Sequence, residues 1–156
     1  MVGMNEKREA RGIDAILSEA RGRLDRVSPE TARERHAAGA LLVDIRYELL
    51  RRRDGLIPGA LVVERNELEW RLDPLCPYRL PQAEHHDVEV LVLCNEGYAS
   101  SLAAVGLHEL GLHRATDVIG GFQAWAAAGL PVLSAAHAQS GPAEPDLPRS
   151  PNEENF

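Results

Sequence analysis

Two short apolar runs constrain the fold of this chain more than any other feature. They cover residues 40–45 and 89–93, and Asp44 lies near the end of the first while Cys94 directly follows the second. Uninterrupted apolar runs of this length are typical of strands that are buried on both faces of a parallel sheet. Weaker runs at 61–63 and 115–119 predict two further strands.

Helical patterns alternate with these strands. They indicate helices over 6–22, 28–38, 48–53, 67–72, 100–110 and 122–128, whereas the proline-containing stretch 73–87 reads as a long surface loop. Ser28 followed by Pro29 is typical of a helix start, and Gly39 and Gly111 are typical of helix ends. The alternation predicts an α/β domain with a mostly parallel sheet. Because ligands of such sheets bind at the carboxyl ends of the strands, the edge near Cys94 is the expected place of function.

The length of 156 residues allows one domain with a proper core. We expect a helical extension over 1–27, the domain over 28–134 and a disordered tail over 135–156, where Pro, Ser, Glu and Asn dominate. The formal net charge of −7 argues against a nucleic-acid partner. No apolar run reaches the roughly 20 residues of a membrane helix, and 1–11 contains no signal core, so a cytoplasmic location is expected.

The loop at Cys94 is the strongest candidate for chemistry. A short strand-to-helix turn containing Gly97 can point successive N–H groups into one concavity, and the helix start adds partial positive charge. Such a turn stabilises an anion, for example a thiolate or a persulfide sulfur. The alternative interpretation is a structural cysteine buried at the end of a core strand. The histidines and cysteines show no ligand spacing, so neither a metal nor a cofactor is predicted.

Five motifs, in this order and spacing, resemble a rhodanese domain. They are Val-Asp-Ile-Arg at 43–46, Ile-Pro-Gly-Ala at 57–60, the loop 94–99, Gly-Gly-Phe-Gln-Ala-Trp at 120–125 and Gly-Leu-Pro-Val at 129–132. The resemblance covers about residues 28–133. It implies a three-layer domain with a central, mostly parallel, five-stranded sheet flanked by helices. It also implies a sulfurtransferase that carries sulfane sulfur as a persulfide on Cys94 to a thiol or cyanide acceptor.

The resemblance places the substrate-binding residues in the loop, and a supporting pair, Asp44 and Arg46, below it. The expected substrate-binding residues are Asn95, Glu96, Gly97, Tyr98, Ala99 and Ser100. The chain departs from many members of the family at Leu56, where they carry His. It also carries Glu96 where active thiosulfate users have a cation. Repulsion by the Glu96 carboxylate should weaken the binding of an anionic donor by about 1 kcal/mol.

There are two alternatives to an active sulfurtransferase, together with two interpretations of the second cysteine. The chain could be a catalytically weak or inactive module for partner binding or redox sensing. A cysteine phosphatase is disfavoured because such enzymes need an Arg at the loop's end, where this chain has Ala99 and Ser100. Cys76, in the long loop, is either a resolving thiol for Cys94 or a surface cysteine without a role. The oligomeric state is not predicted.

Overall fold

The structure is a computed structural model, and it describes residues 9–134. The predicted tail over 135–156 therefore lies outside the described residues. The elements in chain order are α1 (Ile13–Gly22), α2 (Pro29–Ala37), β1 (Leu41–Asp44), α3 (Glu48–Asp54), β2 (Leu61–Val62), the 3₁₀ helix η1 (Arg65–Glu67), α4 (Leu68–Leu72), β3 (Val90–Leu93), α5 (Ala99–Glu109), β4 (Ala115–Asp117) and α6 (Gly121–Ala127).

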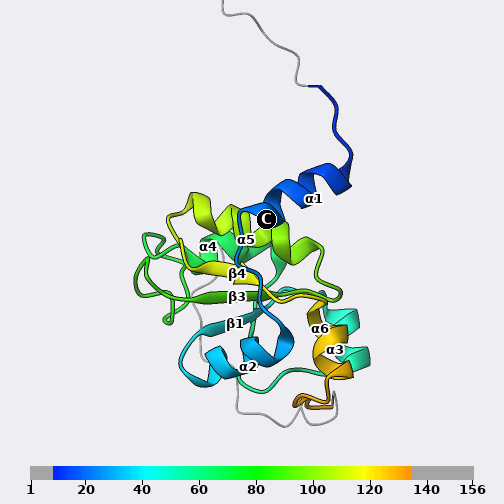
Figure 1. Cartoon of the computed structure of the whole chain (residues 1–156). Helices are drawn as coiled ribbons and strands as arrows, with labels where there is room; N and C mark the ends of the chain where they lie inside the picture. Colours follow the sequence, from blue (N-terminus) through cyan, green and yellow to red (C-terminus); the bar gives the residue numbers. More distant parts are fainter. Residues whose placement is uncertain (1–8, 135–156) are drawn as a thin grey trace, which may run out of the picture.

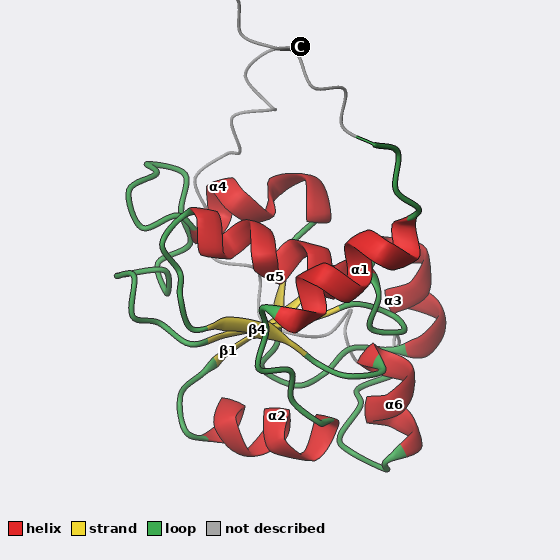
Figure 2. Ribbon diagram, turned by 45° about the horizontal axis from the view of Figure 1, so that its top comes forward, coloured by secondary structure: helices red, strands yellow, loops and turns green. Residues whose placement is uncertain are grey.

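The four strands form one parallel sheet in the order β2-β1-β3-β4. Helices α1, α4 and α5 lie on one face of this sheet, and α2 and α6 lie on the other, which gives three layers (Figures 1 and 2). Since all strands are parallel, their carboxyl ends meet at one edge. That edge brings together Asp44 at the end of β1, Cys94 just after β3 and Asp117 at the end of β4.

The prediction of five strands is wrong for the described residues, which contain four. Beside β4, where a further strand would pair, only Val27 makes a parallel bridge, to Val118. Val27 donates to the Asp117 carbonyl at 3.1 Å and accepts from the Ile119 N–H at 2.8 Å. The pairing ends there because the next residue, Ser28, already caps α2 by accepting from the Thr31 N–H at 3.1 Å.

The predicted helices are present with shifted ends. The described part of the first begins at Ile13, and α2 begins at Pro29 as its capping pattern predicts. Gly39, at φ +114°, takes the chain from α2 into β1. No helix within residues 9–134 combines the length and the apolar character that crossing a bilayer requires.

The sheet separates two apolar clusters. Successive side chains of β3 pack on opposite faces of the sheet: Val92 packs toward α4 and α5, and Leu91 packs toward α2 and α6. Trp125 of α6 is 1% exposed, and its Nε1 donates to the Pro131 carbonyl at 2.9 Å. Trp125 is therefore an anchor of the apolar cluster on this face. The two clusters pack against opposite faces of the sheet and hold in place the edge that carries Cys94.

Candidate active site

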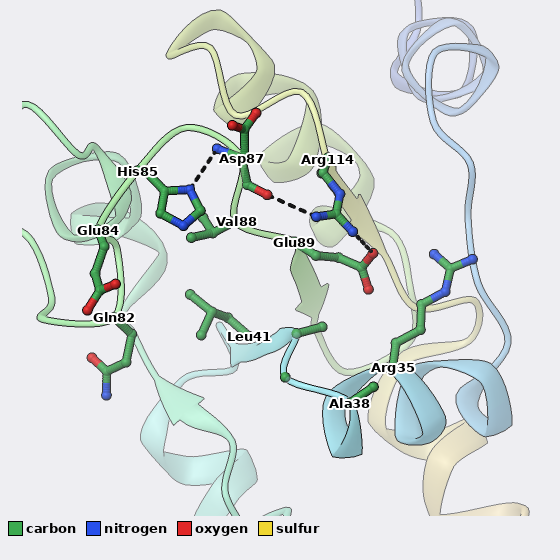
Figure 3. Close-up of a pocket in the computed structure, with 12 residues that line it drawn as sticks. Arg35, Ala38, Leu41, Gln82, Glu84, His85, Asp87, Val88, Glu89 and Arg114 are labelled. Carbon is green, nitrogen blue, oxygen red and sulfur yellow. Dashed lines mark hydrogen bonds and ion pairs between the residues drawn. The ribbon is translucent and has the colours of Figure 1, made fainter.

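One hollow of about 620 Å³ lies at the amino edge of the sheet, away from Cys94. Figure 3 shows Arg35 of α2 on one side, His85 of the long loop on the other, and Arg114 reaching Glu89 between them. Arg114 pairs with Glu89 at 3.0 Å and donates to the Asp87 carbonyl at 3.0 Å. Of the charged side chains that line this hollow, Arg114 and Glu89 pair with each other. Within residues 9–134, no group of three or more His, Cys, Asp or Glu side chains could hold a metal ion.

A second hollow, of about 450 Å³, lies at the carboxyl edge, and Cys94 forms part of its wall. The thiol is almost enclosed, with Cys94 only 7% exposed. Tyr47 and Tyr98 lie at the mouth and are mostly exposed. The remaining lining residues are Ile45, Arg46, Leu50, Arg65, Asn95, Glu96 and Ala99.

Backbone N–H groups of the loop surround the Cys94 sulfur. Gly97 N donates to Sγ at 3.1 Å and Ser100 N donates to it at 3.4 Å. Ser100 lies in the first turn of α5, so the sulfur also faces the positive end of that helix. This is the concavity that the strand-to-helix turn predicts, and it favours negative charge on sulfur.

A chain of hydrogen bonds leads from Cys94 into the protein. The Cys94 thiol donates to Ser100 Oγ at 3.2 Å, and Ser100 Oγ donates to Asp117 Oδ2 at 2.7 Å. Asp117 is fully buried and also pairs with Arg26, whose Nε lies 2.9 Å from Oδ1. The hydroxyl proton of Ser100 is thus directed at a carboxylate, so Ser100 Oγ can take the thiol proton only as it passes its own proton to Asp117.

The Gly120-Gly121 motif brings α6 against the loop. The carbonyls of Cys94 and Asn95 accept the N–H groups of Phe122 at 2.8 Å and Gln123 at 3.0 Å. A Cβ at Gly121, whose φ is +58°, would lie 2.3 Å from the Cys94 carbonyl oxygen. Glycine is therefore required for this close approach as well as for the turn.

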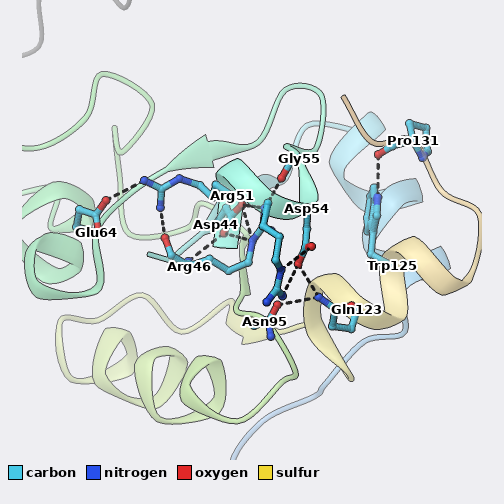
Figure 4. A network of polar contacts seen from close by, with 11 residues as sticks. Asp44, Arg46, Arg51, Asp54, Gly55, Glu64, Asn95, Gln123, Trp125 and Pro131 are labelled. Carbon is cyan, nitrogen blue, oxygen red and sulfur yellow. Dashed lines mark hydrogen bonds and ion pairs between the residues drawn. The ribbon is translucent and has the colours of Figure 1, made fainter. Parts of the chain in front are cut away.

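Asp44 and Arg46 form a buried ion pair within the network of Figure 4, and Arg46 lines the hollow. Arg46 is 2% exposed, and its Nη2 donates to Asp44 Oδ2 at 2.7 Å and to the Gly55 carbonyl at 2.9 Å. Its guanidinium lies over the Phe122 ring at 3.8 Å from the centroid. The predicted supporting pair is a buried ion pair that joins β1, the end of α3 and α6, and its support of the Cys94 loop stays a prediction.

A second contact in Figure 4 joins the loop to α3 through α6. Gln123 Nε2 donates to Asn95 Oδ1 and to Asp54 Oδ2, both at 3.0 Å. The hydrogen bond from Arg53 holds the pKa of Asp54 below its usual value, and the contact with Gln123 lowers it further. Asp54 therefore stays ionised at neutral pH and keeps accepting from Gln123.

The predicted loop residues divide into two groups. Asn95, Glu96, Tyr98 and Ala99 line the hollow, whereas Gly97 and Ser100 contact the sulfur itself. Sequence reasoning missed other residues at this edge: Arg65, Asp117, Arg26 and Arg21. Arg65 follows β2 and Asp117 ends β4, so their positions at strand ends could have identified them from the sequence. No sequence pattern marks Arg21 and Arg26 as site residues.

Cys76 does not line the hollow that contains Cys94. It is partly buried in the long loop, whose later residues 82 and 84–89 reach the opposite edge of the sheet. The structure therefore favours the interpretation of Cys76 as a surface cysteine.

Comparison with solved structures finds similar folds. A protein of unknown function from Rhodopseudomonas palustris, described as a possible tyrosine phosphatase, is 35% identical with a TM-score of 0.72, and the match covers 84% of this chain and all of that one. A rhodanese-related protein from Thermoplasma volcanium is 25% identical with a TM-score of 0.56, covering 69% and 96%. The human single-domain sulfurtransferase is 27% identical with a TM-score of 0.53, covering 65% and 95%.

No curated protein matches the chain significantly. The family model of the rhodanese-like domain matches residues 28–128. That region contains the whole sheet, the Cys94 loop and helices α2 to α6. The chain therefore belongs to the rhodanese-like domain family.

Proposed function

We propose that this protein is a sulfurtransferase that carries a sulfane sulfur as a persulfide on Cys94 and passes it to a thiol or cyanide. The observation that carries the proposal is the position of the Cys94 sulfur. It lies in the wall of a hollow of about 450 Å³ and accepts N–H groups from Gly97 and Ser100. These donors are fixed before any reaction, so they can stabilise negative charge without reorganising.

The transfer runs in two balanced steps. The Cys94 thiolate attacks the transferable sulfur of the donor and a new S–S bond forms at Cys94. The donor's S–S bond, or the C–S bond of mercaptopyruvate, breaks, with the electron pair leaving on the donor fragment. The acceptor then attacks the terminal sulfur, and Cys94 leaves as a thiolate. Before the first step the thiol proton must depart, and Ser100 and Asp117 offer it a path.

The donor is proposed to be a persulfide of low negative charge. Glu96 is exposed at the hollow and repels an anion. Arg65 approaches from η1, but its Nη1 is already paired with Glu69 Oε1 at 2.8 Å. The charges at the mouth therefore offset one another, and an organic persulfide suits the site better than thiosulfate.

The test is cyanolysis of protein that has been treated with thiosulfate, mercaptopyruvate or glutathione persulfide. Thiocyanate should be released by the wild-type chain and by Cys76→Ser, because Cys76 lies outside the hollow, and not by Cys94→Ser. Release from none of the three donors would refute sulfur transfer. Hydrolysis of an aryl phosphate that depends on Cys94 would instead favour a phosphatase, against which the absence of an Arg at positions 99 and 100 counts.

A catalytically weak or inactive module for partner binding or redox sensing is the second candidate. The observation that favours it is the enclosure of Cys94, which is 7% exposed and contacts the Ser100 hydroxyl. Under this alternative no donor would load Cys94 with sulfur, and mild peroxide would oxidise it in a redox sensor but leave it unchanged in a partner-binding module. Peptide mass spectrometry after each treatment distinguishes the two functions.

The location and the division of the chain are also proposals. We place the protein in the cytoplasm, where reducing conditions keep a cysteine such as Cys94 free. We treat 28–134 as the catalytic domain and 1–27 as an extension. No nucleic-acid partner is proposed, because the net charge is −7.

A further inference from the structure

Two arginines that precede the family-matched region hold the outer side of the Cys94 loop. Arg21 Nη2 donates to the Gly97 carbonyl at 2.7 Å, and Arg26 Nη2 donates to the same oxygen at 3.0 Å. Both lie before residue 28, where the family match begins. We propose that Arg21 and Arg26 are positioning residues for the reaction at Cys94. This inference rests on the proposed sulfur transfer.

Gly97 connects the arginines to the sulfur. Its N–H donates to Cys94 Sγ at 3.1 Å, while its carbonyl is held by the two guanidinium groups. Gly97 has a φ of +85°, and a Cβ there would lie 2.7 Å from the Gly120 nitrogen, so the residue is confined between the arginines and α6. The carbonyl of a trans peptide points away from the following N–H, so fixing the Gly97 carbonyl outward turns the Tyr98 N–H inward.

The same arginines contact the second partner of the sulfur. Arg26 pairs with Asp117, which accepts the hydroxyls of Ser100 and Ser101 at 2.7 and 2.8 Å. Arg21 Nε donates to Ser101 Oγ at 3.3 Å, which closes a ring of hydrogen bonds behind the loop. Without Arg26 the buried Asp117 would keep its charge uncompensated, two hydrogen bonds away from Cys94.

Helix α1 places Arg21 through its apolar face. Leu17 and Ala20 are buried, and α1 lies along α5 (Figures 1 and 2). Arg21 is four residues after Leu17 and so lies on the same side of the helix. Its guanidinium also lies 5.4 Å from the centroid of the Tyr98 ring, at the mouth of the hollow. The extension thus contacts two residues of the Cys94 loop, Gly97 and Tyr98.

The test uses the full chain with Cys76→Ser, so that Cys94 is the single thiol. The variants are Arg21→Ala, Arg21→Lys, Arg26→Ala and Arg26→Lys. The matched control is Arg23→Ala, because Arg23 is in the same segment and, among residues 9–134, pairs only with the exposed Glu109, at 3.7 Å. Each is measured for kcat and KM with glutathione persulfide, for the rate of alkylation of Cys94 by iodoacetamide, and for melting temperature.

We expect each alanine variant to lower kcat about tenfold with KM unchanged, since a shift of about 1 Å in a reacting group can cost a hundredfold. The lysine variants should recover part of kcat, because an ammonium group can also donate to the Gly97 carbonyl. Alkylation should slow with kcat, while Arg23→Ala should match the parent. If Arg26→Ala does not fold, Arg26→Lys decides: an intermediate kcat supports the proposal, and a parental one contradicts it for Arg26.

Two results would overturn the inference. One is a folded Arg21→Ala with parental kcat and alkylation rate, and the other is an equal loss in Arg23→Ala. A parent chain that no donor loads with sulfur would refute the proposed function instead. In that case the alkylation rates still show whether the two arginines control the reactivity of Cys94.

Discussion

Replacing Gly121 by Ala probes the contact between α6 and the Cys94 loop. The new Cβ would lie 2.3 Å from the Cys94 carbonyl oxygen and 2.8 Å from the Asn95 carbonyl carbon. Ordinary contact begins at 3.4 Å, so the loop or the helix must move by about 1 Å. A backbone oxygen cannot rotate away as a side chain can, so the displacement falls on the loop itself.

The magnitude follows from two separable costs. A left-handed φ costs an alanine about 1 kcal/mol, and overpacking against backbone adds about 1–3 kcal/mol. Gly129→Ala is the matched control, because Gly129 also has a positive φ, +71°, but a Cβ there meets nothing within 4 Å. We therefore expect a loss in the free energy of unfolding of about 1 kcal/mol for Gly129→Ala and about 2–4 kcal/mol for Gly121→Ala.

Urea denaturation measures the stability of both variants, and persulfide loading measures the loop. A displacement of about 1 Å at Cys94 should slow sulfur loading by tenfold or more in Gly121→Ala and leave Gly129→Ala at the wild-type rate. Equal losses of stability in the two variants, together with equal loading rates, would refute the account of the Gly120-Gly121 motif.

Three further substitutions test the charges around the site. Glu96→Gln should raise kcat/KM for thiosulfate about fivefold and leave a neutral donor unaffected, and equal effects on both donors would contradict the repulsion. Arg65→Ala should lower kcat/KM for thiosulfate by a similar factor, because it lines the hollow and bears the opposite charge; an unchanged value would remove Arg65 from donor binding. Arg46→Ala leaves Asp44 buried without its cation and should lower the free energy of unfolding by about 3–5 kcal/mol, as measured by urea denaturation. A loss below about 1 kcal/mol would contradict a stabilising role of the Asp44–Arg46 pair.

The sequence predicts the parts of this fold that depend on local pattern. The apolar runs locate β1 and β3 because strands buried on both faces consist mostly of apolar residues. Ser28 and Pro29 locate the start of α2 because capping is a contact between residues three apart. The pairing of Asp44 with Arg46 is equally local, since the two residues are separated by one position.

The remaining features depend on contacts between distant segments. The predicted fifth strand does not form, because Val27 alone pairs with Val118 before α2 begins at the Ser28 cap. Arg65 reaches the hollow because β2 lies beside β1, an order that no local pattern reveals. Arg21 meets Gly97 across 76 positions of sequence, through the packing of α1 on α5. The loop 94–99 itself carries no cation, and the cations that line the hollow, Arg46 and Arg65, come from other segments of the chain.

The most direct test of sulfur transfer is the intact mass of the protein after exposure to glutathione persulfide and removal of excess donor. We predict that the wild-type chain and Cys76→Ser each gain the mass of one sulfur atom, that peptide mapping places it on Cys94, and that cyanide removes it. Cys94→Ser should gain none. A chain that stays folded and gains no sulfur from this donor, thiosulfate or mercaptopyruvate, or that gains it only on Cys76, would contradict the proposed function.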